Sequence, residues 1–194
     1  MARTKEFDPD TALRAALELF WRRGYEATSM ADLVTHLGIG RASLYATFGS
    51  KHELYLRALD RYGQSEDPRL TRELSAPGPV LPAVRALVRR FADESTAEAT
   101  RARGCLVTNT AVELGPHDRD AARRVERSWD TLETLLHSAL VRARAQGELP
   151  EGRDPLTLAR MLLVLLQGLR VVGKACADPT RARDAAEQAL ALLD

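Results

Sequence analysis

The sequence predicts an all-α protein, and three observations support this prediction. Hydrophobic residues make up 45% of the chain and aromatic residues only 5%, while Ala, Leu, Arg and Glu, which favour helices, are abundant. Apolar residues recur at intervals of three and four positions, which places them on one face of a helix. Capping residues, glycines and prolines divide the chain into about nine such segments.

Four short helices are expected in residues 1–62, which we treat as one domain. The predicted helices are one over 9–23, a short one that ends at Gly38, one over 40–48, and one that begins at Ser50. The first helix can be capped by Asp8 or Asp10. Ser29 and Asp32 have the spacing of a capping box at the start of the second helix.

Residues 63–194 are expected to form a larger helical bundle. The domain opens with a polar, proline-rich segment, GQSEDPRLTRELSAPGPVLP, which predicts a linker or a loosely helical connection. Longer helices are then predicted over about 80–98, 104–114, 118–146, 154–176 and 180–193. The helix over 154–176 is apolar on almost every side from Met161 to Leu166, so it needs partners on more than one side.

Composition and charge exclude several classes of protein. The charged start, MARTKEFDPD, lacks the apolar stretch of a secretion signal, so a cytoplasmic location is expected. The longest apolar run, 161–166, is much shorter than the roughly 20 residues of a membrane span, so no contact with a membrane is expected. The two cysteines and four histidines match no metal-ligand spacing, so neither a metal nor another cofactor is expected.

The helix over 40–48 carries polar and small residues on most of its surface. On a helical wheel, Leu44 and Phe48 form a narrow stripe that faces the core. The positions left facing outward are Arg41, Ala42, Ser43, Tyr45, Ala46 and Thr47. No acidic residue occurs from Gly38 to His52, and such a surface suits the phosphate backbone of a nucleic acid.

Two short helices joined at LGIG predict a helix-turn-helix, whose second helix enters the DNA major groove. Arg41 suits a bidentate contact with guanine, while Ala42 and Ala46 permit close approach to thymine methyl groups. The residues that flank the groove near the phosphates are Ser43, Thr47 and Lys51. The alternative is an ordinary surface helix whose polar side chains are merely solvated.

The segment GYEATSMADLVTHLGIGRASLYATFGSKHELYLRAL resembles the DNA-binding domain of TetR-family transcriptional repressors. The resemblance covers about residues 9–60, and the helical remainder resembles that family's ligand-binding and dimerisation domain. It implies groove-facing roles for Arg41, Ala42, Tyr45 and Ala46. It implies phosphate contacts for Thr28, Ser29, Ser43, Thr47, Lys51 and the start of the following helix. Gly40, Ala42 and Thr47 depart from the family's usual Ser, Gly and His, which leaves the operator sequence open.

The resemblance also implies a homodimer that binds a palindromic double-stranded DNA operator and releases it when a small-molecule effector binds. Polar residues on otherwise apolar faces, with their apolar neighbours, are the candidate effector contacts: Phe91, Cys105, Asn109, Glu113, Trp129, His137, Met161 and Gln167. The candidate dimer interface is Leu158, Leu162, Leu165, Leu169 and Val172. For both sets the alternative is an ordinary position inside the subunit.

Cys105 offers a second mode of regulation. It follows Arg101 and Arg103 at an expected helix start, a setting that lowers the pKa of a thiol. A redox or electrophile sensor is therefore one interpretation, and an inert buried thiol is the other. An enzyme with Cys105 as nucleophile and His117 or His137 as base has no supporting phosphate loop, nucleophile elbow or acid pair. We therefore predict a regulator and no catalysis.

Overall fold

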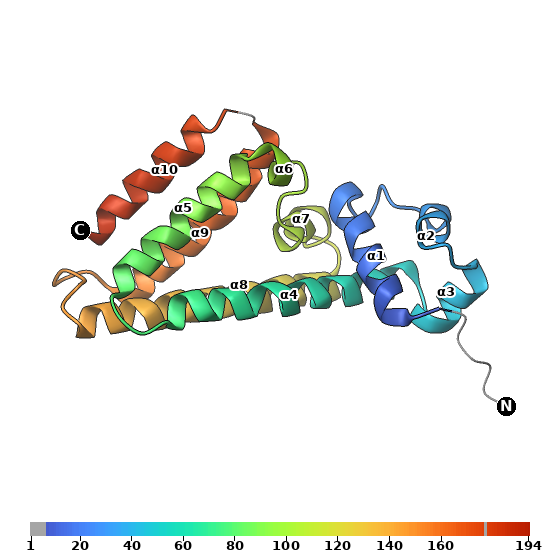
Figure 1. The fold of residues 1–194 in the computed structure, drawn as a ribbon, viewed down its shortest axis with the longest axis horizontal. Coiled ribbons are helices and arrows are strands. Elements are labelled where there is room, and N and C mark those ends of the chain that lie inside the picture. Colours follow the sequence, from blue (N-terminus) through green and yellow to red (C-terminus); the bar gives the residue numbers. More distant parts are fainter. Residues whose placement is uncertain (1–6, 177) are drawn as a thin grey trace.

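The computed structural model describes residues 7–176 and 178–194, and every regular element in them is helical (Figure 1), which confirms the all-α prediction. The helices are α1 Pro9–Arg23, α2 Met30–Leu37, α3 Arg41–Phe48, α4 Lys51–Ser75, α5 Val80–Thr96, α6 Glu98–Arg101, α7 Leu106–Glu113, α8 Arg119–Ala145, α9 Pro155–Ala175 and α10 Thr180–Leu190, followed by the 3₁₀ helix Ala191–Leu193. The sequence analysis missed only α6, which is a single turn of four residues.

The molecule is elongated, with two lobes joined by long helices (Figure 1). We call the end formed by α1, α2, α3 and the start of α4 the N-terminal lobe. The other end is the C-terminal lobe, in which α9 packs against α5, α8 and α10. Helices α4 and α8 run side by side between the lobes, and α7 lies at their junction.

Local signals form the N-terminal helices as predicted. Asp8 caps α1 by accepting hydrogen bonds from the backbone N–H groups of Asp10 and Thr11. Ser29 and Asp32 form the capping box of α2, and α2 ends at Gly38. These signals act within a few residues of one another, so the sequence is sufficient to place them.

Of the two alternatives for the segment after residue 62, the linker is wrong and the helical connection is correct, because α4 continues without a break from Lys51 to Ser75. Pro68 lies inside the helix and removes one backbone N–H donor. The second half of α4 is stabilised by the C-terminal lobe, where Leu74 is buried and the Arg142 guanidinium donates to the Leu74 carbonyl at 2.8 Å. The domain boundary expected at residue 62 thus lies within a helix that both lobes share.

Two clusters of buried residues correspond to the two lobes. The C-terminal cluster is formed by α5, α8, α9, α10 and the end of α4. The N-terminal cluster combines α1, α2, α3 and α4 with buried residues from far along the chain, namely Cys105, Leu106, Val107, Leu114, Ala121 and Val125. Inside it, the hydroxyl groups of Tyr55 and Thr110 share a hydrogen bond of 2.8 Å. Segments more than 40 positions apart therefore complete one core.

Helix α9 bears on two expectations. By length and composition it could cross a membrane, although its longest apolar run is short. In this structure it packs at the centre of the C-terminal lobe. The predicted dimer interface along it is wrong for Leu158, Leu162 and Leu169, which are buried within the subunit because that side of α9 faces the lobe's own core. Leu165 also packs against this core, and of the five residues only Val172 is exposed.

Gly173 lies where α9 approaches α5 most closely. A Cβ atom at this position would come within 2.2 Å of the Ser95 carbonyl oxygen. We expect Gly173→Ala to lower the free energy of unfolding by about 1–3 kcal/mol in urea denaturation, because the two helix backbones must separate.

Gly63→Ala is the matched control, because Gly63 also lies inside a helix. There an added Cβ meets only Asp67 Oδ2, at 3.8 Å, which is ordinary contact. Removing this glycine should leave the free energy of unfolding unchanged or raise it by up to about 1 kcal/mol. Equal stability of the two variants would contradict the close approach of α5 and α9.

Candidate nucleic-acid interface and internal cavity

Helices α2 and α3 form a helix-turn-helix. Gly38 ends α2 in the left-handed conformation, with a φ of 64°, which turns the chain sharply toward α3. Ile39, Leu44 and Phe48 are buried in the core of the N-terminal lobe. These three side chains fix α3 by one narrow side and leave most of its circumference outside the core.

The opposite side of α3 faces solvent. Its exposed residues are Arg41, Ala42, Tyr45 and Ala46, and its half-buried residues are Ser43 and Thr47. The Arg41 guanidinium lies 3.5 Å from the Tyr45 hydroxyl and 5.7 Å from the centroid of its ring. The burial of α3 agrees with the helical wheel, and its open surface carries hydrogen-bond donors and small side chains without a carboxylate.

The remaining predicted phosphate contacts are partly used inside the protein. Thr28 is fully buried, and its hydroxyl donates to the Gly24 carbonyl at 2.7 Å, so its side chain is not part of the surface. Ser29 is exposed and caps α2. Lys51 Nζ donates to the carbonyls of Tyr25 and Thr28, at 2.9 and 3.0 Å. Lys51 thus ties the start of α4 to the turn between α1 and α2.

Helix α7 supplies a carboxylate to this same turn. The Glu113 oxygens accept hydrogen bonds from the backbone N–H groups of Tyr25, at 3.1 Å, and Glu26, at 2.8 Å. A second contact joins the His52 ring to the Asp118 carboxylate at 2.5 Å. No sequence signal identifies these contacts, because the partners are between 66 and 88 positions apart.

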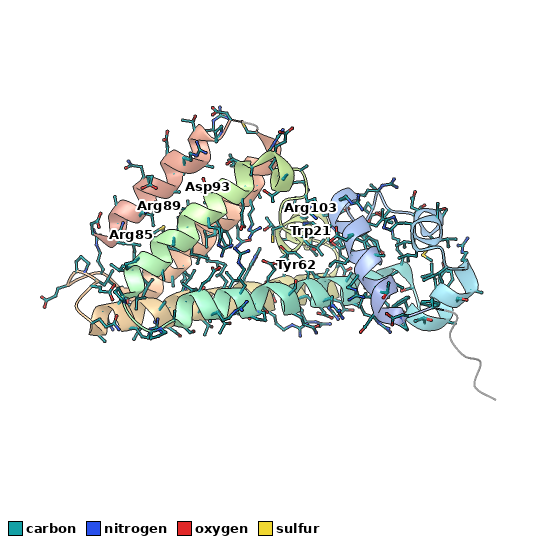
Figure 2. The ribbon with its side chains drawn as sticks, in the orientation of Figure 1. Trp21, Tyr62, Arg85, Arg89, Asp93 and Arg103 are labelled. Carbon is teal, nitrogen blue, oxygen red and sulfur yellow. The ribbon has the colours of Figure 1, made fainter. Side chains whose placement is uncertain are left out.

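A third contact between the lobes lies where α1 and α4 meet the segment that leads into α7 (Figure 2). The Trp21 indole N–H donates to the Gly104 carbonyl at 3.0 Å. The Arg103 guanidinium lies over the Trp21 ring, 4.5 Å from its centroid, and Tyr62 packs edge-on against that ring. The Tyr62 hydroxyl donates to Cys105 Sγ at 3.6 Å. The start of α7 is therefore fixed to the N-terminal lobe, as is its end at Glu113.

A small cavity of about 40 Å³ lies between α4, α5, α8 and α9. It brings together four of the predicted effector contacts, Phe91, Cys105, Trp129 and Gln167. Arg170 also lines it, and the sequence analysis missed this residue because an arginine in a helix usually lies at the surface. A wider groove of about 460 Å³ between α4 and α8 adjoins the cavity and shares four lining residues with it, Gly63, Asp67, Val107 and Ser128.

The other four predicted effector contacts do not line this cavity. Asn109 and Glu113 line a separate pocket beside α1, where Asn109 donates to the Arg103 carbonyl at 2.8 Å. Met161 packs against the C-terminal core, and His137 is half-buried on α8. These four residues lie on apolar helix faces because those faces pack within the C-terminal lobe or between the lobes.

The charges around Cys105 favour its thiolate form. Burial acts to raise the pKa of the thiol, but the Arg170 guanidinium and hydrogen bonds from Thr108 outweigh burial and lower the pKa below its ordinary value. Burial also raises the pKa of Tyr62 well above its ordinary value, so its hydroxyl keeps its proton and donates to the sulfur. Within the part of the chain that the structure describes, no cluster of His, Cys, Asp and Glu is arranged to hold a metal ion.

Family models match both lobes. Residues 12–58 match the bacterial regulatory proteins of the tetR family, and residues 80–189 match the tetracyclin repressor-like C-terminal domain. The chain belongs to the TetR family. It is therefore a DNA-binding transcriptional regulator, which confirms the resemblance found in the sequence and the prediction that the chain is not an enzyme.

Individual TetR-family proteins resemble the whole chain. The HTH-type transcriptional regulator YezE of Bacillus subtilis is 39% identical over 195 residues, which cover 100% of both chains. The HTH-type transcriptional repressor ComR of Escherichia coli is 33% identical over 87% of this chain and 80% of its own. A cysteine mutant of CifR, solved with a 26 bp double-strand operator DNA, has 30% identity, a TM-score of 0.85 and coverage of 100% of both chains.

Asp118 caps α8 and pairs with His52 between the lobes of this TetR-family regulator. Burial acts to raise the pKa of Asp118, but the Ala121 N–H and His52 outweigh burial and lower it. A carboxylate with a lowered folded pKa stabilises the protein above its unfolded pKa of about 3.9, and this contribution is lost as pH falls through the folded value. Asp118→Asn should lower the free energy of unfolding at pH 7 by about 1 kcal/mol, and the difference should disappear in acid.

Urea denaturation between neutral and acidic pH measures this difference. Asn retains the capping function, so the substitution removes chiefly the charge. Asp154→Asn is the matched control, because Asp154 caps α9 in the same way but forms no pair with the N-terminal lobe. The stabilising role of the Asp118–His52 contact would be contradicted by either of two results. One is a loss of unfolding free energy in Asp118→Asn that does not change with pH, and the other is an equal loss in the control.

Proposed function

We propose that the chain is a dimeric repressor that binds a palindromic double-stranded DNA operator and releases it when a small-molecule effector binds. The observation that carries this proposal is α3, which presents donors and small side chains to solvent and is held by only two buried residues of its own. The operator complex of the CifR mutant and the description of ComR as a repressor support it. Its site of action would be the cytoplasm, where bacterial DNA is accessible.

In the proposed complex, α3 enters the major groove of each operator half-site. Arg41 contacts guanine, and Ala42, Tyr45 and Ala46 lie against neighbouring bases. The proposed phosphate contacts are Ser29, Ser43, Thr47 and Lys51. Lys51 has one ammonium N–H left for a phosphate, because two are used by backbone carbonyls.

Arg41→Ala tests base recognition. The variant should lose about 1–3 kcal/mol of operator binding, because a bidentate base contact is removed, while binding to unrelated DNA falls much less. The operator is first isolated from genomic fragments with the unmodified protein, and affinities are then measured by fluorescence anisotropy at constant salt.

Arg72→Ala is the matched control, because Arg72 is exposed on α4 outside the N-terminal lobe. It should bind the operator as the unmodified protein does. An Arg41→Ala variant with unchanged operator affinity would contradict the proposed role of α3. An equal loss on operator and unrelated DNA would make Arg41 a phosphate contact.

The proposed dimer interface is the solvent-facing side of α9. Val164 is 71% exposed, and Val171 and Val172 are 47% and 40% exposed. Gly168, between them, has no atom within 4 Å of its Cβ position, so a partner helix can approach closely. Exposed apolar surface of this kind marks an interaction site. Because α5, α8 and α10 already cover the other sides of α9, a second subunit is the proposed partner of this face and a membrane is not.

Val164→Glu tests this interface. The buried charge should convert a dimer into a monomer in sedimentation velocity at micromolar concentration, with the thermal midpoint of the subunit fold retained. Operator affinity should fall as well, since the two half-sites are then bound independently.

Leu192→Glu is the matched control, because Leu192 is 42% exposed in the 3₁₀ helix Ala191–Leu193, outside α9. This variant should remain a dimer. A dimeric Val164→Glu protein, or a monomeric unmodified protein, would contradict the proposed interface.

Helix α7 is the proposed route by which an effector acts on DNA binding. It begins at Cys105, which lines the cavity, and ends at Glu113, which caps the turn before α2. Movement of α7 would change the orientation of α3 in both subunits, whose recognition helices must lie roughly 34 Å apart to read two half-sites. An effector must bind the released state more tightly than the DNA-bound state.

A second candidate function is regulation by thiol chemistry at Cys105. The lowered pKa of this thiol beside Arg170 favours it. Its side chain is only 7% exposed, so an oxidant or electrophile must enter through the cavity. Peroxide-treated protein that keeps its operator affinity would contradict this candidate.

A further inference from the structure

Arg170 is a half-buried cation inside the C-terminal lobe. It lies on α9 and lines the cavity between α4, α5, α8 and α9. Burial acts to lower the pKa of its guanidinium, but the nearby acidic groups of Cys105, Tyr62, Glu94 and Glu66 outweigh burial and raise it. The guanidinium carbon lies 4.2 Å from the centroid of the Phe91 ring. Among the residues that the structure describes, none forms an ion pair with Arg170 within 4.0 Å, so its donors are open to an anionic ligand.

Two neutral donors line the same cavity. The Trp129 indole N–H is buried and has no hydrogen-bond partner among the described residues. Gln167 accepts a hydrogen bond from the Thr108 hydroxyl at 2.8 Å through its carbonyl oxygen, which leaves its NH₂ group as a donor. A guanidinium, an indole N–H and an amide NH₂ therefore line one space, and the buried indole N–H lacks an acceptor there.

The size of the cavity and its neighbours limit the anion. Its volume of about 40 Å³ is far smaller than the roughly 150 Å³ that holds benzene, so it accommodates a head group only. The adjoining groove of about 460 Å³ has room for the rest of a ligand. Glu66 and Asp67 line the α4 side and oppose a second negative charge, and burial raises the pKa of Asp67. A planar monoanion fits these conditions better than a phosphate dianion.

We infer that the effector is a small carboxylate whose head group pairs with Arg170 and accepts hydrogen bonds from Trp129 and Gln167. Its apolar body extends past Val107 into the groove between α4 and α8. This inference rests on the proposed function, since it names the chemistry of the effector. Cys105 lies beside the head group and takes no covalent part.

The test is isothermal titration calorimetry of the full chain without DNA. The probes are sodium acetate, butyrate and benzoate, each compared with its neutral amide at the same ionic strength. At least one carboxylate should bind about tenfold or more tightly than its amide, because a guanidinium forms charge-assisted bonds only with the anion. Failure of all three carboxylates to bind up to about 10 mM would overturn the inference.

Three variants locate the site. Arg170→Met should abolish the preference for the carboxylate over the amide, and Trp129→Phe, which keeps an aromatic ring, should weaken carboxylate binding roughly two- to tenfold. Arg183→Met, an exposed arginine on α10, is the matched control and should bind normally. Preference retained in Arg170→Met would overturn the inference.

Operator binding is measured on the same preparations. This measurement distinguishes failure of the carboxylate inference from failure of the proposed repressor function. The carboxylate that binds through Arg170 should lower operator affinity of the unmodified protein but not of Arg170→Met. Unchanged operator affinity in the unmodified protein would overturn the identification of this carboxylate as the effector. Failure to isolate any operator would instead overturn the proposed function. The carboxylate binding measured by calorimetry would remain valid in that case.

Discussion

The N-terminal lobe depends on a core that it cannot complete by itself. A segment of about 60 residues buries only about 60% of the surface exposed by its unfolded chain, so additional apolar contacts are valuable. Here Leu106, Leu114, Ala121 and Val125 supply them from α7 and its surroundings. Because these residues belong to helices that also build the C-terminal lobe, the position of α3 is tied to the packing of that lobe.

Polar contacts also fix how the N-terminal lobe is oriented relative to α7. The Glu113 carboxylate satisfies two backbone N–H groups of the turn before α2, and Lys51 satisfies two carbonyls of the same turn. Burying such groups without partners is unfavourable, so the lobes have a preferred relative orientation. A change in α7 must either carry the turn with it or break these bonds. In the proposed mechanism, this requirement favours two distinct arrangements over a continuous range.

One buried donor without a partner lies where a ligand would act. The Trp129 indole N–H has no hydrogen-bond acceptor among the described residues, and Arg170 lines the same cavity. The Thr108–Gln167 hydrogen bond joins α7 to α9 beside them. A bound anion would therefore stabilise unfavourable groups and alter the neighbourhood of α7 at the same time. Natural proteins tolerate such local costs chiefly at functional sites.

The sequence by itself determined the helices of the N-terminal lobe, the helix-turn-helix and the outward face of α3. These features depend on helical period and on hydrogen bonds such as that between Ser29 and Asp32, which join residues close in sequence. Tertiary structure alone decided that α4 continues through Pro68, which side of α9 is buried, and that Arg170 faces a cavity. Local bonds are specified by neighbouring residues, whereas burial depends on which distant side chains meet.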